Sequence, residues 1–145
     1  MIKINIKKLH NDAVIPMYAT DGSACVDLVS VNEVVLMPGR EHVAFKTGLA
    51  FEVPMNHVML VYSRSGHGFK QGLRLANCVG VIDSDYRGEL MVKLHNDSNV
   101  PVSIPAGSSI AQAMILPIPR IEFTLVDELS DTVRGANGLG STTAS

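Results

Sequence analysis

Apolar and polar residues alternate, or form short apolar blocks, along most of this 145-residue chain. A two-residue period of this kind predicts strands. The segments that show it are "IKINI", "ACVDLVS", "EVVLM", "HVAFKTGLAFEV", "HVMLVYS", "VGVI", "ELMVKLHN", "PVSI", "SIAQAMILPI" and "RIEFTLVDEL". No window longer than about ten residues keeps the i, i+3, i+4, i+7 apolar spacing of an amphipathic helix. We therefore expect an all-β single domain, either a barrel or a double-sheet jelly roll.

Turn residues separate the predicted strands. The segment "MPGR" places Pro38 and Gly39 for a type II turn, and "PAGS" places Pro105 and Gly107 for a type I turn. Short strands joined by such turns agree with the all-β interpretation.

The composition adds a prediction about the surface. Charged residues make up 18% of the chain, against 46% for the set AVILMFWYC, and a free monomer normally carries more charge on its surface. We therefore expect part of the surface to be buried between subunits. The net charge is -2 and Lys and Arg are scattered. Stable nucleic-acid binding and attachment to an anionic membrane are therefore not predicted.

The chain has no apparent targeting segment or metal motif. No stretch approaches the roughly 20 apolar residues that span a bilayer, and "MIKINIKKLH" alternates where a signal peptide needs a continuous apolar block. We expect a soluble intracellular protein, cytoplasmic or in the host compartment if a virus encodes it. Cys25 and Cys78 form no CxxC pair, and the histidines lack metal-ligand spacing. Neither a zinc site nor a disulfide framework is predicted.

The C-terminal part differs from the rest. Residues 120–129, "RIEFTLVDEL", alternate like a strand but are separated from the body by Pro117 and Pro119. This strand is expected to pair either with a neighbouring subunit or with an edge strand of its own chain. The segment that follows, "SDTVRGANGLGSTTAS", has too little apolar surface to order by itself. We divide the chain into a domain at 1–129 and a flexible arm at 130–145.

Residues 80–89, "GVIDSDYRGE", concentrate acidic side chains in an apolar neighbourhood. An EF-hand is excluded, because Arg87 and Leu94 stand where the calcium loop needs oxygen ligands. Asp83 and Asp85 on one strand would lie about 6–7 Å apart, near the separation in inverting glycosidases. However, the chain has no Trp and only 5% aromatic residues to hold a sugar. Taken alone, the stretch is most simply a hairpin turn capped by Asp.

Two further segments change that interpretation. Residues 63–66, "SRSG", offer a guanidinium, hydroxyl groups and a flexible backbone for phosphate oxygens. Residues 134–143, "RGANGLGSTT", offer an arginine, glycines and hydroxyl groups, although without the lysine of a P-loop. Each segment alone is also compatible with a plain turn or tail. Together with an acid in the middle of the chain, they favour binding of a polyphosphate and attack by an oriented water.

The sequence resembles the trimeric dUTPase family (deoxyuridine 5'-triphosphate nucleotidohydrolases) along nearly its whole length. The family's motifs occur in order as "GSACVDL" at 22–28, "SRSG" at 63–66, "NCVGVIDSDYRGE" at 77–89, "GSSIAQAMI" at 107–115 and "RGANGLGST" at 134–142. The third motif is highly specific. The others are modest or weak alone and strong in this order.

The resemblance implies a jelly-roll-like (beta-clip) homotrimer that hydrolyses dUTP to dUMP and pyrophosphate. This reaction would lower dUTP and supply dUMP for thymidylate synthesis. Each active site would be shared among the subunits, with the arm of one chain closing over it. Asp83 would orient and deprotonate the water that attacks the α-phosphorus, and Asp27 would hold Mg²⁺ through water. Gln112 would lie beside the α-phosphate or the water, and Arg134 would neutralise the terminal phosphates.

Substrate binding is likewise carried over from the motifs. The residues are Arg64, Ser65, Gly66, Asn77, Gly80, Val81, Ile82, Tyr86, Leu139, Gly140, Ser141 and Thr142. Asn77 and the backbone of residues 78–82 would recognise uracil, and Tyr86 would lie against the deoxyribose and exclude a 2'-hydroxyl. Asp85, Arg87 and Glu89 are expected to stabilise the turn or form ion pairs.

Some positions depart from the family pattern. Leu139 replaces a common aromatic residue, whose stacking on a base is worth about 1–3 kcal/mol, and Ser109 replaces a usual arginine. Two rival functions remain: a dCTP deaminase of the same fold superfamily, and a trimeric binding protein without catalysis.

Overall fold

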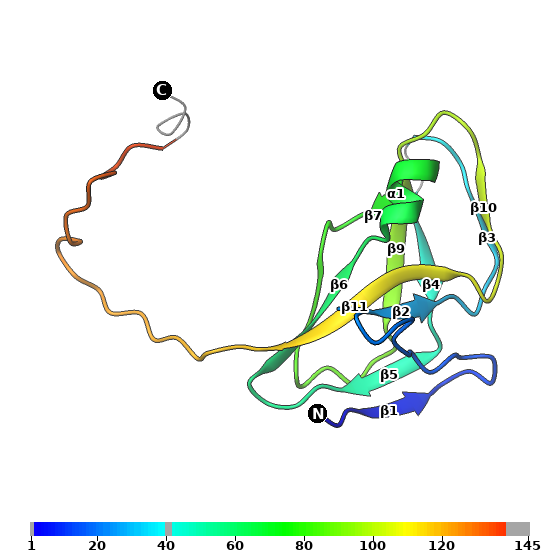
Figure 1. Cartoon of the computed structure of the whole chain (residues 1–145), viewed down its shortest axis with the longest axis horizontal. Helices are drawn as coiled ribbons and strands as arrows, with labels where there is room; N and C mark the ends of the chain where they lie inside the picture. The colour runs from blue at the N-terminus through cyan, green and yellow to red at the C-terminus, as the bar shows by residue number, and fades with distance from the viewer. Residues whose placement is uncertain (1, 40–41, 139–145) are drawn as a thin grey trace.

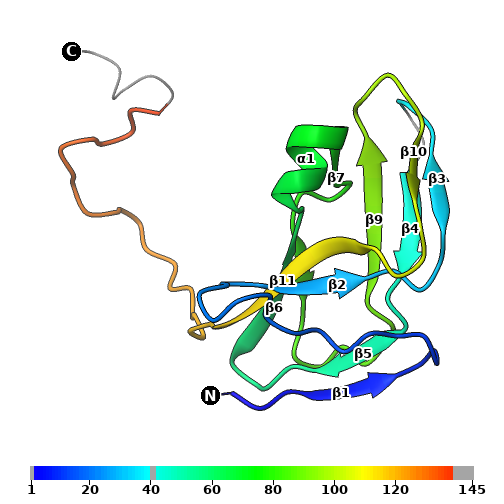
Figure 2. The same ribbon diagram turned by 45° about the vertical axis from the view of Figure 1, so that its right-hand side comes forward.

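The computed structural model describes residues 2–39 and 42–138. Strands dominate it, as the sequence predicts, and one short helix joins them (Figures 1 and 2). The elements are β1 (Asn5–Lys8), β2 (Val26–Val29), β3 (Val34–Leu36), β4 (His42–Lys46), β5 (Leu49–Glu52), β6 (His57–Tyr62), α1 (Ser65–Gln71), β7 (Leu73–Leu75), β8 (Gly80–Ile82), β9 (Met91–Asn96), β10 (Val102–Ile104) and β11 (Ser109–Pro117). No helix among the described residues is long and apolar enough to cross a membrane.

The strands form small sheets, all with antiparallel pairing. A four-stranded sheet has the order β2-β11-β6-β8 and a three-stranded sheet the order β4-β9-β7, with the pairs β1-β5 and β3-β10 beside them. In both ribbon views the β1-β5 pair lies at the end of the body near the N-terminus, and the β3-β10 pair lies at the opposite end of β9 (Figures 1 and 2). Pairing between strands far apart in sequence brings the dispersed motifs into one body.

One apolar core holds these sheets together. Phe45, Leu28, Leu36 and Ile110 are fully buried in it. Asn96 is also fully buried, but its amide donates to Leu36 O at 3.0 Å and to Val100 O at 2.8 Å, so its N–H groups are satisfied.

Local structure departs from the sequence-based expectations in three places. The predicted strand at 42–53 divides into β4 and β5, because Gly48 at φ +66 approaches the Cβ of His10 too closely for any side chain. The helix α1 and strand β7 were not expected, since a seven-residue helix with two glycines has no readable apolar period. The predicted type I turn is wrong, because Gly107 lies at φ +81 and Ser108 N donates to Pro105 O.

The chain leaves the body after β11. Ile118 N donates to Asn56 O at 2.7 Å, and beyond this contact the ribbon runs away from the sheets (Figures 1 and 2). No strand is assigned in residues 118–138, so the expected edge strand of the same chain is wrong. Its alternating side chains Ile121, Phe123 and Leu125 are 72%, 89% and 98% exposed. No described part of their own chain covers them.

Candidate functional site

A first pocket, which we name the Arg64 pocket, gathers side chains from three of the sequence motifs. It has a volume of about 480 Å³. Its chemically relevant lining residues are Asp27 from β2, Gln112 from β11, and Arg64, Ser65 and Gly66 at the start of α1.

Strand register explains why these residues meet. Because β11 lies between β2 and β6, Gln112 pairs with Asp27 on one side and with Tyr62 on the other. Tyr62 ends β6, so the loop that follows it begins beside Gln112. The Gln112 amide donates to Ser63 O at 3.0 Å and ties that loop to the sheet.

Arg64 forms the electrostatic centre of this pocket. Its guanidinium donates to Ser109 O at 3.1 Å and to the Asp27 carboxylate at 3.2 Å. The Arg64 and Asp27 side chains are 35% and 36% exposed, so ligands can reach both. Any anion that binds Arg64, or cation that binds Asp27, must compete with this ion pair.

His67 on α1 is a residue that the sequence-based analysis missed. Its Nδ1 is buried and has no hydrogen-bond partner among the described residues. Burial lowers the pKa of His67, the nearby Arg64 guanidinium lowers it further, and Asp27 opposes the shift. The sequence signal that could have identified His67 is its position directly after the "SRSG" motif. The neutral imidazole is therefore favoured beside the Arg64 pocket.

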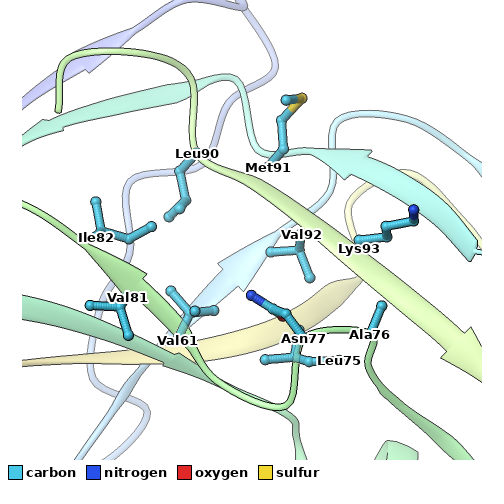
Figure 3. A pocket seen from close by; sticks show the side chains of 11 residues that line it. Val61, Leu75, Ala76, Asn77, Val81, Ile82, Leu90, Met91, Val92 and Lys93 are labelled. Carbon is cyan, nitrogen blue, oxygen red and sulfur yellow. The ribbon is translucent and has the colours of Figure 1, made fainter.

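A second pocket, the Asn77 pocket, has a volume of about 490 Å³ (Figure 3). The predicted base-recognition residues Asn77, Gly80, Val81 and Ile82 all line it. Val61, Leu75, Leu90 and Val92 supply apolar walls. In Figure 3 the Asn77 amide points toward Val61 and Val92, and Lys93 also lines the pocket.

The walls of the Asn77 pocket come from different sheets. β8 has only β6 as a neighbour among the described strands, so its other backbone edge is free to donate and accept hydrogen bonds along the pocket. The hairpin before β8 is tight, with Cys78 at φ 63 and Val79 N donating to Asn77 O at 2.7 Å. A largely apolar slot with the Asn77 amide, the Lys93 ammonium and a free strand edge suits a flat, hydrogen-bonding ring.

The turn at residues 83–89, the Asp83 turn, lies outside both pockets. Asp83 and Asp85 are exposed and line a smaller hollow of about 230 Å³ together with Arg120. Tyr86 N donates to Asp83 O at 3.3 Å, and the Tyr86 hydroxyl donates to Glu89 O at 3.0 Å. Arg87 stabilises the turn as expected by donating to Ser84 O and Tyr86 O, whereas the Glu89 carboxylate accepts from Gly48 N outside the turn.

The predicted site residues thus lie in separate places on one chain. The Arg64 pocket, the Asn77 pocket and the Asp83 turn share no lining residue. Arg134 is in the arm, where its guanidinium donates to Asn137 O at 2.9 Å. Leu139, Gly140, Ser141 and Thr142 lie outside the described residues.

The metal-ligating side chains of the described residues form no ready-made site. Among residues 2–39 and 42–138, no group of three or more His, Cys, Asp or Glu side chains is arranged to hold an ion. Asp27 offers a single carboxylate, already paired with Arg64. This donor set fits an ion such as Mg²⁺ that keeps its waters and takes further oxygens from a phosphate substrate.

Comparison with known proteins identifies the family. The dUTPase family model matches residues 11–143. The chain belongs to the dUTPase family. A deoxyuridine 5'-triphosphate nucleotidohydrolase from Nautilia profundicola is 47% identical over 141 residues, which cover 97% of this chain and 99% of the relative. One from Hydrogenobaculum sp. is 42% identical over 141 residues, covering 97% and 98%.

Solved dUTPase structures agree with the all-β fold. The dUTPase of Staphylococcus bacteriophage 80alpha with dUPNHPP has a TM-score of 0.88 at 29% identity, covering 98% of this chain and 99% of that chain. A mutant dUTPase from phage phi11 of S. aureus, solved to reveal the coordination of a structural Mg(II) ion, has a TM-score of 0.82 at 26% identity, covering 90% and 100%.

Proposed function

We propose that this chain is a dUTP diphosphatase, which hydrolyses dUTP to dUMP and pyrophosphate. The observation that carries the proposal is the pair of complementary pockets on a dUTPase-family chain. The Asn77 pocket suits a pyrimidine, and the Arg64 pocket carries the cation and backbone needed for phosphates. Membership of the family and the dUTP analogue bound by the phage relative support dUTP as the substrate.

In the proposed mechanism, Asp83 acts as the general base. Its carboxylate takes a proton from a water as the water oxygen attacks the α-phosphorus. The bond from that phosphorus to the oxygen bridging the α- and β-phosphates then breaks, and pyrophosphate leaves. A positioned base contributes about 10²- to 10⁴-fold. Gln112 holds the α-phosphate or the water, and Arg64 and Arg134 neutralise charge on the phosphates.

Mg²⁺ is the proposed cofactor, held through water by Asp27. When bound, the ion offsets phosphate charge and orients the triphosphate chain. In the free chain Asp27 pairs with Arg64. Binding of a metal-bound triphosphate therefore has to separate this pair, freeing the carboxylate for the hydrated ion and the guanidinium for phosphate oxygens.

We further propose that the active site is shared within a homotrimer. The separation of the Arg64 pocket from the Asn77 pocket and the Asp83 turn favours this arrangement, because a second chain can bring its own Arg64 pocket to them. An apolar groove of about 440 Å³, lined by Ile4, Ile6, Ile15 and Phe51 among others, also supports assembly. Its residue in β1, Ile6, lies on a strand that pairs only with β5 among the described strands, so residues 120–129 of another chain can pair with the other edge of β1.

A substrate panel tests the activity. Purified protein with Mg²⁺ is given dUTP, dCTP, UTP and dTTP separately, and pyrophosphate and ammonia are measured. Pyrophosphate from dUTP alone supports the proposal. Ammonia from dCTP would indicate a deaminase instead, and the absence of both products would indicate a binding protein.

Asp83→Asn tests the general base. We expect turnover to be lost while dUTP binding, followed by calorimetry, is retained. Asp85→Asn is the matched control, since it removes the same charge from the same turn. Near-normal turnover by Asp83→Asn would remove this residue from the mechanism.

Subunit mixing tests the shared site. An equal mixture of Asp83→Asn and Arg64→Ala chains, co-refolded into trimers, leaves about a quarter of the sites with both residues intact if the two come from different chains. We expect about that fraction of wild-type activity, with each variant alone inactive. Activity no higher than that of the separate variants would place both residues in one chain.

A further inference from the structure

Arg87 bonds to two backbone carbonyl groups of the Asp83 turn. Its Nη1 donates to Ser84 O at 2.7 Å and to Tyr86 O at 2.9 Å. These carbonyl groups lie on either side of Asp85, so one guanidinium closes the turn over that residue. Hydrogen bonds from a charged donor are shorter and stronger than neutral ones. Arg87 therefore constrains the backbone between the proposed general base and the proposed sugar-contacting tyrosine.

The Arg87 guanidinium is itself held from outside the turn. Its Nη2 lies 3.7 Å from Glu52 Oε1, and the other oxygen of that carboxylate accepts a hydrogen bond from the Asn5 amide at 2.7 Å. Asn5 and Glu52 are directly paired in the β1-β5 ladder. A chain of polar contacts thus connects the edge of the β1-β5 sheet to the Asp83 turn.

The position of Tyr86 depends closely on this turn. Its ring lies over Gly88, where an added Cβ would come within 2.6 Å of the Tyr86 Cζ. Its hydroxyl donates to Glu89 O, and Gly48 N donates to the Glu89 carboxylate at 2.9 Å. The Tyr86 hydroxyl is therefore held by Glu89 O, and the Tyr86 carbonyl and that of Ser84 are held by Arg87. Loss of either constraint allows the ring to move.

We propose that Arg87, braced by Glu52, is a positioning residue that sets the place of Tyr86 relative to Asp83 and so controls discrimination between dUTP and UTP. The inference rests on the proposed function, in which Tyr86 excludes the 2'-hydroxyl. Glu52 is the second positioning residue, and Asn5 fixes the orientation of its carboxylate. None of the three is expected to touch the substrate.

The test compares kcat and KM for dUTP and UTP in Arg87→Gln, Glu52→Gln and Gly88→Ala. Arg87→Gln should lower the dUTP-to-UTP ratio of kcat/KM by about tenfold, the size expected for one charge-assisted hydrogen bond, with most of the change in a higher kcat/KM for UTP. Glu52→Gln should move the ratio in the same direction by a smaller factor. Gly88→Ala displaces the tyrosine ring directly and should reproduce the loss of discrimination.

Arg74→Gln serves as the matched control. Arg74 also pairs with a half-exposed carboxylate, through an Nε to Asp97 Oδ2 contact of 2.6 Å, but it lies on β7 outside the Asp83 turn. The dUTP-to-UTP ratio of kcat/KM of Arg74→Gln should stay at the wild-type value. The unfolding midpoint of each variant shows whether a changed ratio comes from a repositioned Tyr86 or from loss of the fold. If Arg87→Gln does not fold, Glu52→Gln alone tests the positioning role.

The outcomes distinguish this inference from the proposed function. A wild-type protein that hydrolyses UTP as well as dUTP refutes the role proposed for Tyr86. A discriminating wild type whose folded Arg87→Gln and Glu52→Gln variants keep both the ratio and kcat overturns the positioning role and leaves the proposed function standing.

Discussion

Ser63 connects the two pockets, and its hydroxyl offers a quantitative test of that connection. Ser63 Oγ accepts a hydrogen bond from Leu75 N at 2.8 Å, while its carbonyl accepts from Gln112. Leu75 is 2% exposed and lines the Asn77 pocket. In Ser63→Ala, the buried N–H of Leu75 loses its acceptor, which costs about 1–3 kcal/mol.

The expected effect appears in both stability and binding. Each kcal/mol lowers the unfolding midpoint by about 2–4 °C for a chain of this size. Calorimetric or urea unfolding should be measured at one protomer concentration, because assembly makes the midpoint concentration-dependent. We also expect KM for dUTP to rise more than kcat falls, since the altered strand leads into Asn77 and away from the reacting phosphorus.

Ser103→Ala provides the control, because Ser103 is an exposed hydroxyl residue on β10. It should change stability by less than about 0.5 kcal/mol. If Ser63→Ala matches this control in both unfolding and KM, the hydrogen bond to Leu75 does not connect the pockets and the reasoning is refuted.

Two further predictions concern single residues. Folding lowers the pKa of His67 from its usual 6.5, so at and below about that pH the unfolded state binds more protons and the free energy of unfolding falls. His67→Gln should therefore lose less free energy of unfolding than wild type between about pH 7 and 5.5 in urea titrations. An equal loss in the two proteins would contradict this. Cys78 lies at φ 63, which costs a non-glycine residue about 1–2 kcal/mol; Cys78→Gly should thus unfold at a midpoint at or above wild type and Cys78→Val below it, whereas the reverse order would show that this backbone strain is not present.

The strands could largely be predicted from local pattern. The two-residue period identifies β6, β8, β10 and β11 within a few residues, because alternation reports which side of a strand is buried. Local pattern does not decide residues 120–129, which alternate in sequence yet form no strand within the described chain. Alternation shows that a segment can pair, but hydrogen bonding requires a partner edge, and the local pattern does not identify one.

The candidate site was likewise only partly predictable from the sequence. The residue types and the order of the motifs already indicated a polyphosphate site and the dUTPase family. The contact of Gln112 with the loop after β6 could not be read from them, because it depends on the register of β11 between β2 and β6. Register is set when one face of each strand is buried in a common core.

The amino-acid sequence by itself determined the strand-rich class, the motif chemistry and the acidic turn, since these depend on neighbouring residues. Only the tertiary structure decided that Arg64 pairs with Asp27, that Asn77 and Arg64 line different pockets, and that Arg87 lies beside Glu52. These features join residues distant along the chain, and packing of the whole core fixes their distances.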